Sequence, residues 1–177
     1  MDDPRDQTAV VTGGSRGFGR GIVEALAGAG MRVVALARDP GTLAALAREV
    51  KGRVETVAAD ATDPVTAARV IDRERPRVLV LNAGATGPHR PTRLQTWETF
   101  SVFWQTDVRS AFLWVREALA LPLERGSTIF IGSSTAGRAS RSSPATRPPR
   151  PRSGSSRAAS PPRPRHSGCG SIACCRY

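Results

Sequence analysis

A glycine-rich stretch near the start of the chain has the residue types and spacing to hold a phosphate group. Thr12-Gly13-Gly14-Ser15-Arg16-Gly17-Phe18-Gly19 follows the apolar run Ala9-Val10-Val11 and opens a segment in which Phe18, Ile22 and Leu26 share one helical face. Glycine lets a backbone turn tightly and approach a ligand, because it has no Cβ. The start of a helix adds unpaired N–H groups and a positive dipole end, which attract an anion. Strand, glycine turn and helix in this order therefore predict a site for a dinucleotide pyrophosphate.

The composition indicates one ordinary domain followed by an unusual tail. A chain of 177 residues is long enough for one domain with a buried core. Residues 141–177 contain eight arginines and no acidic residue, so they carry +8 of the net charge of +11. The three cysteines and two histidines lack the spacing of a disulfide framework or a metal site. No charged and apolar leader and no membrane-length apolar run is present, so we expect a cytoplasmic protein without a membrane partner.

Hydrophobic periodicity predicts strands that alternate with helices. The predicted strands are Gln7–Thr12, Arg32–Ala37, Arg53–Ala58, Arg77–Leu81 and Ser127–Ile131. The predicted helices are Gly17–Ala27, Gly41–Val50, a segment from Asp63-Pro64 to about Arg75, and a long region over Trp97–Leu119. This alternation predicts an α/β fold with a parallel, doubly wound sheet, whose apolar strands are covered on both faces.

Two further motifs follow predicted strands. Asn82-Ala83-Gly84 comes directly after the fourth strand, and Gly132-Ser133-Ser134-Thr135-Ala136-Gly137 begins where the fifth strand ends. Together with the glycine turn, these motifs make the chain resemble the short-chain dehydrogenase/reductase family over residues 7–140. The resemblance implies a Rossmann-like sheet of about five strands in the order 3-2-1-4-5. It also implies that Asn82, Ala83 and Gly84 line the cofactor site and that Asp60, after the third strand, lies beside the adenine.

The resemblance also implies an activity and two catalytic residues. Family members transfer a hydride between a nicotinamide dinucleotide and a carbonyl or alcohol, which makes a small molecule of that class the expected substrate. Ser134 corresponds to the serine that steadies the substrate oxygen. Asp107 stands where the family carries a helix Asn that fixes a water in the proton relay, largely through its main-chain carbonyl.

The end of the second strand bears on the choice of nicotinamide cofactor. A carboxylate there bonds the free ribose 2′-hydroxyl of NAD, whereas an arginine accepts the 2′-phosphate of NADP. The chain has Arg38 followed by Asp39, and Arg16 lies inside the glycine turn. Two cations near one phosphate site favour NADP over NAD, although Asp39 leaves NAD as the alternative.

The chain as written lacks the catalytic Tyr-x-x-x-Lys motif of the family. At the corresponding place, Ala145–Arg150 reads Ala-Thr-Arg-Pro-Pro-Arg, and the sole tyrosine and lysine are Tyr177 and Lys51. A proton donor whose pKa is lowered by a nearby ammonium is therefore missing. We expect an NAD(P)-dependent oxidoreductase by ancestry that is inactive in this form. The alternative is a non-catalytic dinucleotide-binding remnant or scaffold.

The tail has the character of sequence read out of frame. Residues 141–177 are rich in Arg, Pro and Ser without helical or strand periodicity, so we expect them to be disordered and separate from the domain over residues 1–140. If each codon's third base is read with the first two bases of the next codon, Ala145–Arg150 can encode Y-A-A-S-K, which contains the missing motif. Gly168–Tyr177 can likewise encode G-L-R-V-N-C-L-L-P-V, similar to the family's next strand. We hypothesise a frameshift between about Ala139 and Pro144.

A chain truncated in this way should be incomplete at one side of the sheet. The fifth strand becomes an exposed edge, and the helix over Trp97–Leu119 loses its neighbour and exposes apolar side chains. The oligomer typical of the family is therefore doubtful. The arginine tail could bind nucleic acid without specificity, but no aromatic residue is interleaved, so we expect no specific nucleic-acid partner.

Overall fold

The computed structural model describes residues 3–86, 91–121, 127–132 and 171–176. The strands are β1 (Thr8–Thr12), β2 (Arg32–Ala37), β3 (Val54–Ala58), β4 (Val78–Leu81), β5 (Ser127–Gly132) and β6 (Ser171–Arg176). The α-helices are α1 (Gly17–Gly28), α2 (Pro40–Glu49), α3 (Pro64–Glu74), α4 (Trp97–Phe103) and α5 (Arg109–Ala120). A π-helix, η3 (Trp104–Val108), joins α4 to α5, and short 3-10 helices cover Pro4–Asp6 and Thr92–Leu94.

The strands form one sheet in the order β3-β2-β1-β4-β5-β6. The first five strands run parallel, with β1 paired to both β2 and β4. This confirms the doubly wound sheet and the order 3-2-1-4-5 predicted from the sequence. Every predicted helix and strand is present in the described residues, with ends within a residue or two of those expected.

Side chains that alternate along the central strands belong to two separate hydrophobic cores, one on each face of the sheet. On one face of the sheet, Val11 and Val33 pack with α1 and α2. On the other face, Val10 and Leu79 pack with α3 and α5. Because successive side chains of a strand point to opposite faces, a strand covered on both sides must be apolar throughout.

Helix α1 turns only part of its apolar face toward the sheet. Phe18, Ile22 and Leu26 do share one side of the helix, but the fully buried residues of α1 are the neighbouring Gly19, Val23 and Ala27. Ile22 and Leu26 flank this stripe at half burial, whereas Phe18 is 73% exposed. The absence of a Cβ at Gly19 lets the helix begin close to the preceding turn.

The end of the chain adds a strand that the sequence did not predict. Residues Ser171–Arg176 pair antiparallel with β5, from Ser127 opposite Arg176 to Gly132 opposite Ser171. The expectation of disorder throughout 141–177 is therefore wrong for β6, and β5 is not the exposed edge that was expected. The segment has no proline and contains an apolar run, so it can satisfy the backbone groups that β5 would otherwise present. The rest of the tail lies outside the described residues.

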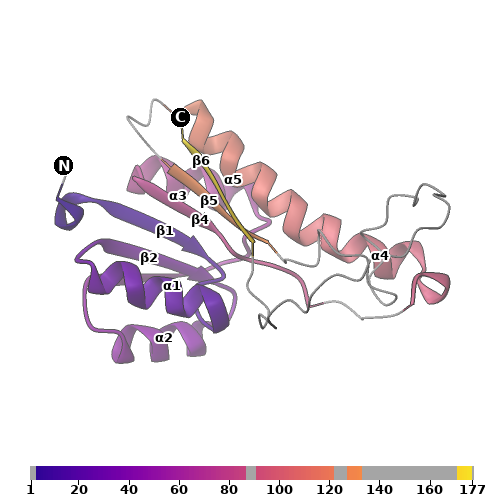
Figure 1. The fold of residues 1–177 in the computed structure, drawn as a ribbon, viewed down its shortest axis with the longest axis horizontal. Helices are drawn as coiled ribbons and strands as arrows, with labels where there is room; N and C mark the ends of the chain where they lie inside the picture. The colour runs from indigo at the N-terminus through magenta and orange to yellow at the C-terminus, as the bar shows by residue number, and fades with distance from the viewer. Residues whose placement is uncertain (1–2, 87–90, 122–126, 133–170, 177) are drawn as a thin grey trace, which may run out of the picture.

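Helices α4, η3 and α5 form one continuous rod that leads away from the sheet (Figure 1). As expected for this region, the rod carries exposed apolar side chains, among them Trp97, Trp104, Phe112 and Leu119. Its inner side is anchored by Leu113 and Trp114, which are buried against the sheet. Among the described residues, every helix is too short or too polar to span a lipid bilayer.

Candidate functional site

A cavity of about 500 Å³ lies where the carboxyl ends of β1, β2, β3 and β4 meet. In parallel α/β sheets, ligands bind at this edge, at the point where neighbouring strands are followed in opposite directions. The predicted cofactor residues on the cavity wall are Gly13, Ser15, Arg16, Gly17, Phe18, Arg38, Asp60, Asn82, Ala83 and Gly84. The other three, Thr12, Gly14 and Gly19, lie behind the wall and shape it.

Buried Thr12 connects the end of β1 to the loop after β4. Its hydroxyl donates to the carbonyl of Val80 at 3.3 Å and accepts from the backbone N–H groups of Asn82 and Ala83, both at 3.1 Å. In return, the Asn82 side chain donates to the carbonyls of Thr12 and Gly13 at 3.2 and 3.0 Å. The two predicted motifs, which lie some seventy residues apart in sequence, are thus held as one unit.

The glycine turn is too close to its surroundings for side chains at two positions. Gly13 has φ +67°, and a Cβ there would lie 2.9 Å from the Cα of Ala83. A Cβ at Gly19 would lie 2.5 Å from the side-chain nitrogen of Asn82. Gly14 ties the turn to β2, since its N–H donates to the carbonyl of Leu36 at 3.1 Å. These glycines therefore bring α1 and the turn against the loop after β4.

The N-terminus of α1 differs from those of α2 and α3. Asp39 caps α2 and Asp63 caps α3, each accepting from backbone N–H groups of the first turn. At α1 the N-cap residue is Arg16, whose side chain makes no capping hydrogen bond. The first N–H groups of α1 thus lack a side-chain acceptor at the cavity, where a ligand anion could take that place.

Charged side chains border the cavity beside the ends of β2 and β3. The side chains of Arg16 and Arg38, which border the cavity, make no hydrogen bond or ion pair with other described residues. The pKa of Asp60 lies below its ordinary value, because the N–H and hydroxyl of Thr62 donate to its carboxylate and Arg38 lies nearby. Asp39 also borders the cavity, but its carboxylate accepts from the Gly41 N–H at 2.9 Å.

Asp107 uses its carboxylate to hold the loop after β4. Its Oδ1 accepts from the backbone N–H of Ala85 at 2.6 Å, and the residue lies in η3, the π-helical part of the rod. Burial raises the pKa of Asp107, and the Ala85 hydrogen bond opposes the rise. The neighbouring Thr106 borders the cavity, whereas Asp107 does not. Ser134, the other predicted catalytic residue, lies outside the described residues.

Several cavity residues were not predicted as site residues. They are Leu36, Ala37, Thr42, Ala59, Ala61, Ala85, Thr86 and Thr106. Most of them end or directly follow a predicted strand, and that position is the one signal that could have found them. Their side chains are small or apolar, so residue type gave no hint of binding.

Replacing Thr12 tests the connection between the two motifs. Thr12→Val keeps the shape but leaves the N–H groups of Asn82 and Ala83 without their acceptor, so we expect a loss of about 2 kcal/mol in the free energy of unfolding. Urea denaturation measures the loss. Thr12→Ser keeps the hydroxyl and serves as the control. Equal stability of the valine and serine variants would show that the connection contributes nothing.

Replacing Asp107 tests the buried carboxylate. Because its folded-state pKa is raised, the contribution of Asp107 to the free energy of unfolding should fall as pH rises from the ordinary aspartate value of about 4. Asp107→Asn keeps an acceptor for Ala85 without the charge, so its stability relative to wild type should increase between pH 4 and pH 7 in urea denaturation. Asp107→Ala, which removes the acceptor, should be destabilised at both pH values. A constant difference between the Asn variant and wild type across this range would contradict the raised pKa.

Comparison with known proteins agrees with this architecture. A family model described as short chain dehydrogenase matches residues 7–145. L-xylulose reductase from Bos taurus is 54% identical over 52 residues, which are 29% of this chain and 21% of that protein.

Solved structures extend the similarity to the fold. The NADP-bound 3-oxoacyl (acyl-carrier-protein) reductase of Agrobacterium tumefaciens C58 has a TM-score of 0.69 at 28% identity, over 78% of this chain and 57% of that one. The 3-ketoacyl-(acyl-carrier-protein) reductase of Brucella melitensis, complexed with NADH, has a TM-score of 0.61 at 25% identity, over 66% of this chain and 50% of that one. The chain thus covers between 50% and 57% of the length of these enzymes. The glycine turn, its link to Asn82 and the matched family model together show that the chain belongs to the short-chain dehydrogenase/reductase family.

Proposed function

We propose that the polypeptide binds NADP(H) in the cavity at the carboxyl ends of β1 to β4. The observation that carries this proposal is the uncapped N-terminus of α1, which meets Arg16 and Arg38 at one cavity. Phosphate oxygens would accept from the first N–H groups of α1, as helix N-termini bind anions elsewhere. The adenosine end would lie toward Arg38 and Asp60, and the nicotinamide end toward the loop after β4.

The preference for NADP over NAD is supported by the use the fold makes of Asp39. A carboxylate that selects NAD must accept from the ribose hydroxyls, but one oxygen of the Asp39 carboxylate already caps α2, which leaves only Oδ2 for that role. Arg38 and Arg16 border the same cavity without ion-pair partners among the described residues, so both guanidinium groups could bond a 2′-phosphate. One similar enzyme was solved with NADP and another with NADH. The preference therefore rests on the residues of this chain.

Removal of the Arg38 guanidinium tests this preference. Arg38→Ala should raise the Kd for NADP⁺ about tenfold or more, the effect of losing a charge-assisted hydrogen bond, and should leave the Kd for NAD⁺ unchanged. Isothermal titration with both dinucleotides measures the two constants. Asp39→Asn is the control, since an asparagine still caps α2 and should keep the preference. An equal loss for NADP⁺ and NAD⁺ in the Arg38 variant would exclude a 2′-phosphate contact.

The proposed role of the polypeptide as written is binding without turnover. In the family, a tyrosine moves the proton and a nearby lysine lowers its pKa. Here Lys51 is exposed in the connection between α2 and β3, at the edge of the sheet opposite the cavity. Tyr177 lies outside the described residues. Hydride transfer is the chemistry that bound NADPH supplies, but without an acid at the acceptor oxygen the reduction of a carbonyl lacks its proton.

Restoring the reading frame gives a direct test of this role. If the frameshift hypothesis is correct, a polypeptide in which the codons after about Ala139 are read in the shifted frame contains Tyr-x-x-x-Lys, and it should oxidise NADPH with a suitable carbonyl. The chain as written should bind NADPH but oxidise it at least about 10²-fold more slowly, the usual contribution of a general acid. A carbonyl panel followed by NADPH absorbance measures both rates. Equal turnover by the two polypeptides would refute the proposal.

Other expectations from the sequence remain predictions. These are the division at residue 140, the cytoplasmic location, the small carbonyl or alcohol substrate, and the doubtful oligomer. A scaffold that has kept the dinucleotide site is the second candidate function. It differs from an inactive oxidoreductase in that binding of the dinucleotide would be its whole activity.

A further inference from the structure

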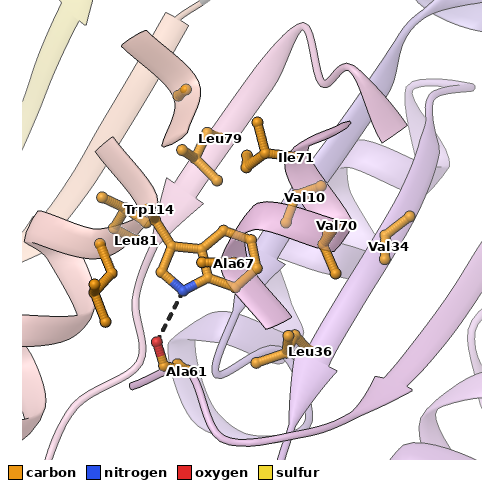
Figure 2. Close-up of a cluster of buried hydrophobic side chains, with 12 residues drawn as sticks. Val10, Val34, Leu36, Ala61, Ala67, Val70, Ile71, Leu79, Leu81 and Trp114 are labelled. Atoms are coloured by element: carbon orange, nitrogen blue, oxygen red, sulfur yellow. Dashed lines mark hydrogen bonds between the residues drawn. The ribbon is translucent and has the colours of Figure 1, made fainter. Parts of the chain in front are cut away.

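Trp114 makes one hydrogen bond from the middle of the core that lies between the sheet and helices α3 and α5. The side chain is fully buried on α5, among residues of the sheet and α3 (Figure 2). Its indole Nε1–H donates to the backbone carbonyl of Ala61 at 2.9 Å, drawn as the dashed line in Figure 2. Ala61 follows β3 and borders the cavity. The indole N–H of Trp114 is thus a polar group through which this core contacts the cavity wall.

The Ala61 carbonyl and the Thr62 N–H belong to the same peptide unit. A peptide is planar and trans, so its carbonyl and N–H point in opposite directions and turn together. The carbonyl side of this unit accepts from Trp114, and the N–H side donates to Oδ1 of Asp60 at 2.8 Å. The orientation that Trp114 imposes on the carbonyl therefore determines where the N–H meets the Asp60 carboxylate.

The remainder of this loop is held by local contacts. The Thr62 hydroxyl also donates to Asp60, and the Asp63 N–H donates to the Asp60 carbonyl at 3.1 Å. These bonds shape the turn but leave the Ala61 carbonyl without a partner. Since Ala61 is only 7% exposed, its carbonyl would lose most of its access to water and needs an internal donor. The indole N–H is that donor.

We infer that Trp114 is a positioning residue for the adenosine end of the dinucleotide. Through the peptide between Ala61 and Thr62, it sets the Asp60 carboxylate and the cavity wall formed by Ala59–Ala61. The inference rests on the proposed function, since it names the residue that prepares that site for its ligand. The remaining surface of the indole is packing, and only the N–H group carries the positioning role.

The experiment removes the N–H group and keeps the shape of the side chain. In a Trp97→Phe, Trp104→Phe background, Trp114 is the single tryptophan, and it can be replaced by 3-benzothienylalanine, in which sulfur takes the place of N–H. The two replaced tryptophans are exposed on the rod and outside the cavity. Trp114→Phe provides a second variant that also lacks the donor. Urea denaturation and circular dichroism establish that each protein is folded.

Two probes separate the halves of the site. The Kd for adenosine 2′,5′-bisphosphate should rise about fivefold to tenfold in the benzothienyl protein, because the carbonyl turns to find another partner. The Kd for nicotinamide mononucleotide should stay as in the parent. In addition, the pKa of Asp60, followed by NMR, should rise toward its ordinary value as the Thr62 N–H moves away. A residue with a packing role alone would change neither the ratio of the two Kd values nor the pKa.

The outcomes separate this inference from the proposed function. A parent protein that binds neither NADP⁺ nor adenosine 2′,5′-bisphosphate overturns both. A parent that binds, together with a folded benzothienyl protein of unchanged affinity and unchanged Asp60 pKa, overturns the inference alone. Equal losses for both probes would also overturn it, because the effect would then not belong to the adenosine end.

Discussion

The hydrogen bonds between the Thr12 hydroxyl and the backbone of Asn82 and Ala83 are the constraint on which the site depends. They join the carboxyl ends of β1 and β4. At this point the strand order changes direction, since β2 and β3 lie on one side of β1 and β4 lies on the other. The Asn82 side chain makes a second connection by donating to the carbonyl of Gly13, and it leaves no room for a Cβ at Gly19. The opening of α1 is consequently held against the loop after β4, and the cavity lies between them.

The electrostatics of the cavity follow from how the fold uses its carboxylates. The carboxylates of Asp39 and Asp63 cap the N-termini of α2 and α3. At α1 an arginine occupies the capping position, so the partial positive charge of the helix start is not neutralised by a side chain. This distribution makes one end of the cavity attractive to a phosphate group. Arg38 and Asp39 both border the cavity, and one oxygen of the Asp39 carboxylate is held in the cap of α2.

The rod of α4, η3 and α5 supports the cavity from two directions. Asp107 holds the backbone of Ala85 near one end, and Trp114 holds the backbone of Ala61 near the other. Both contacts act on main-chain groups of loops that follow strands, so the rod supports the cavity wall mainly from behind. The outer side of the same rod exposes large apolar groups such as Trp104 and Phe112. Fewer side chains are therefore compatible with the inner positions of the rod than with its exposed outer positions.

The amino-acid sequence by itself determined the alternation of strands and helices, the glycine turn, the start of α3 at Asp63-Pro64 and many of the residues that line the cavity, because these depend on periodicity and on neighbours within a few positions. It could not show that Phe18 faces outward, that the end of the chain pairs with β5, or that Trp114 donates to Ala61 across 53 positions. Those features were decided by the tertiary structure, since each depends on which distant backbone group lies within reach once the sheet has formed.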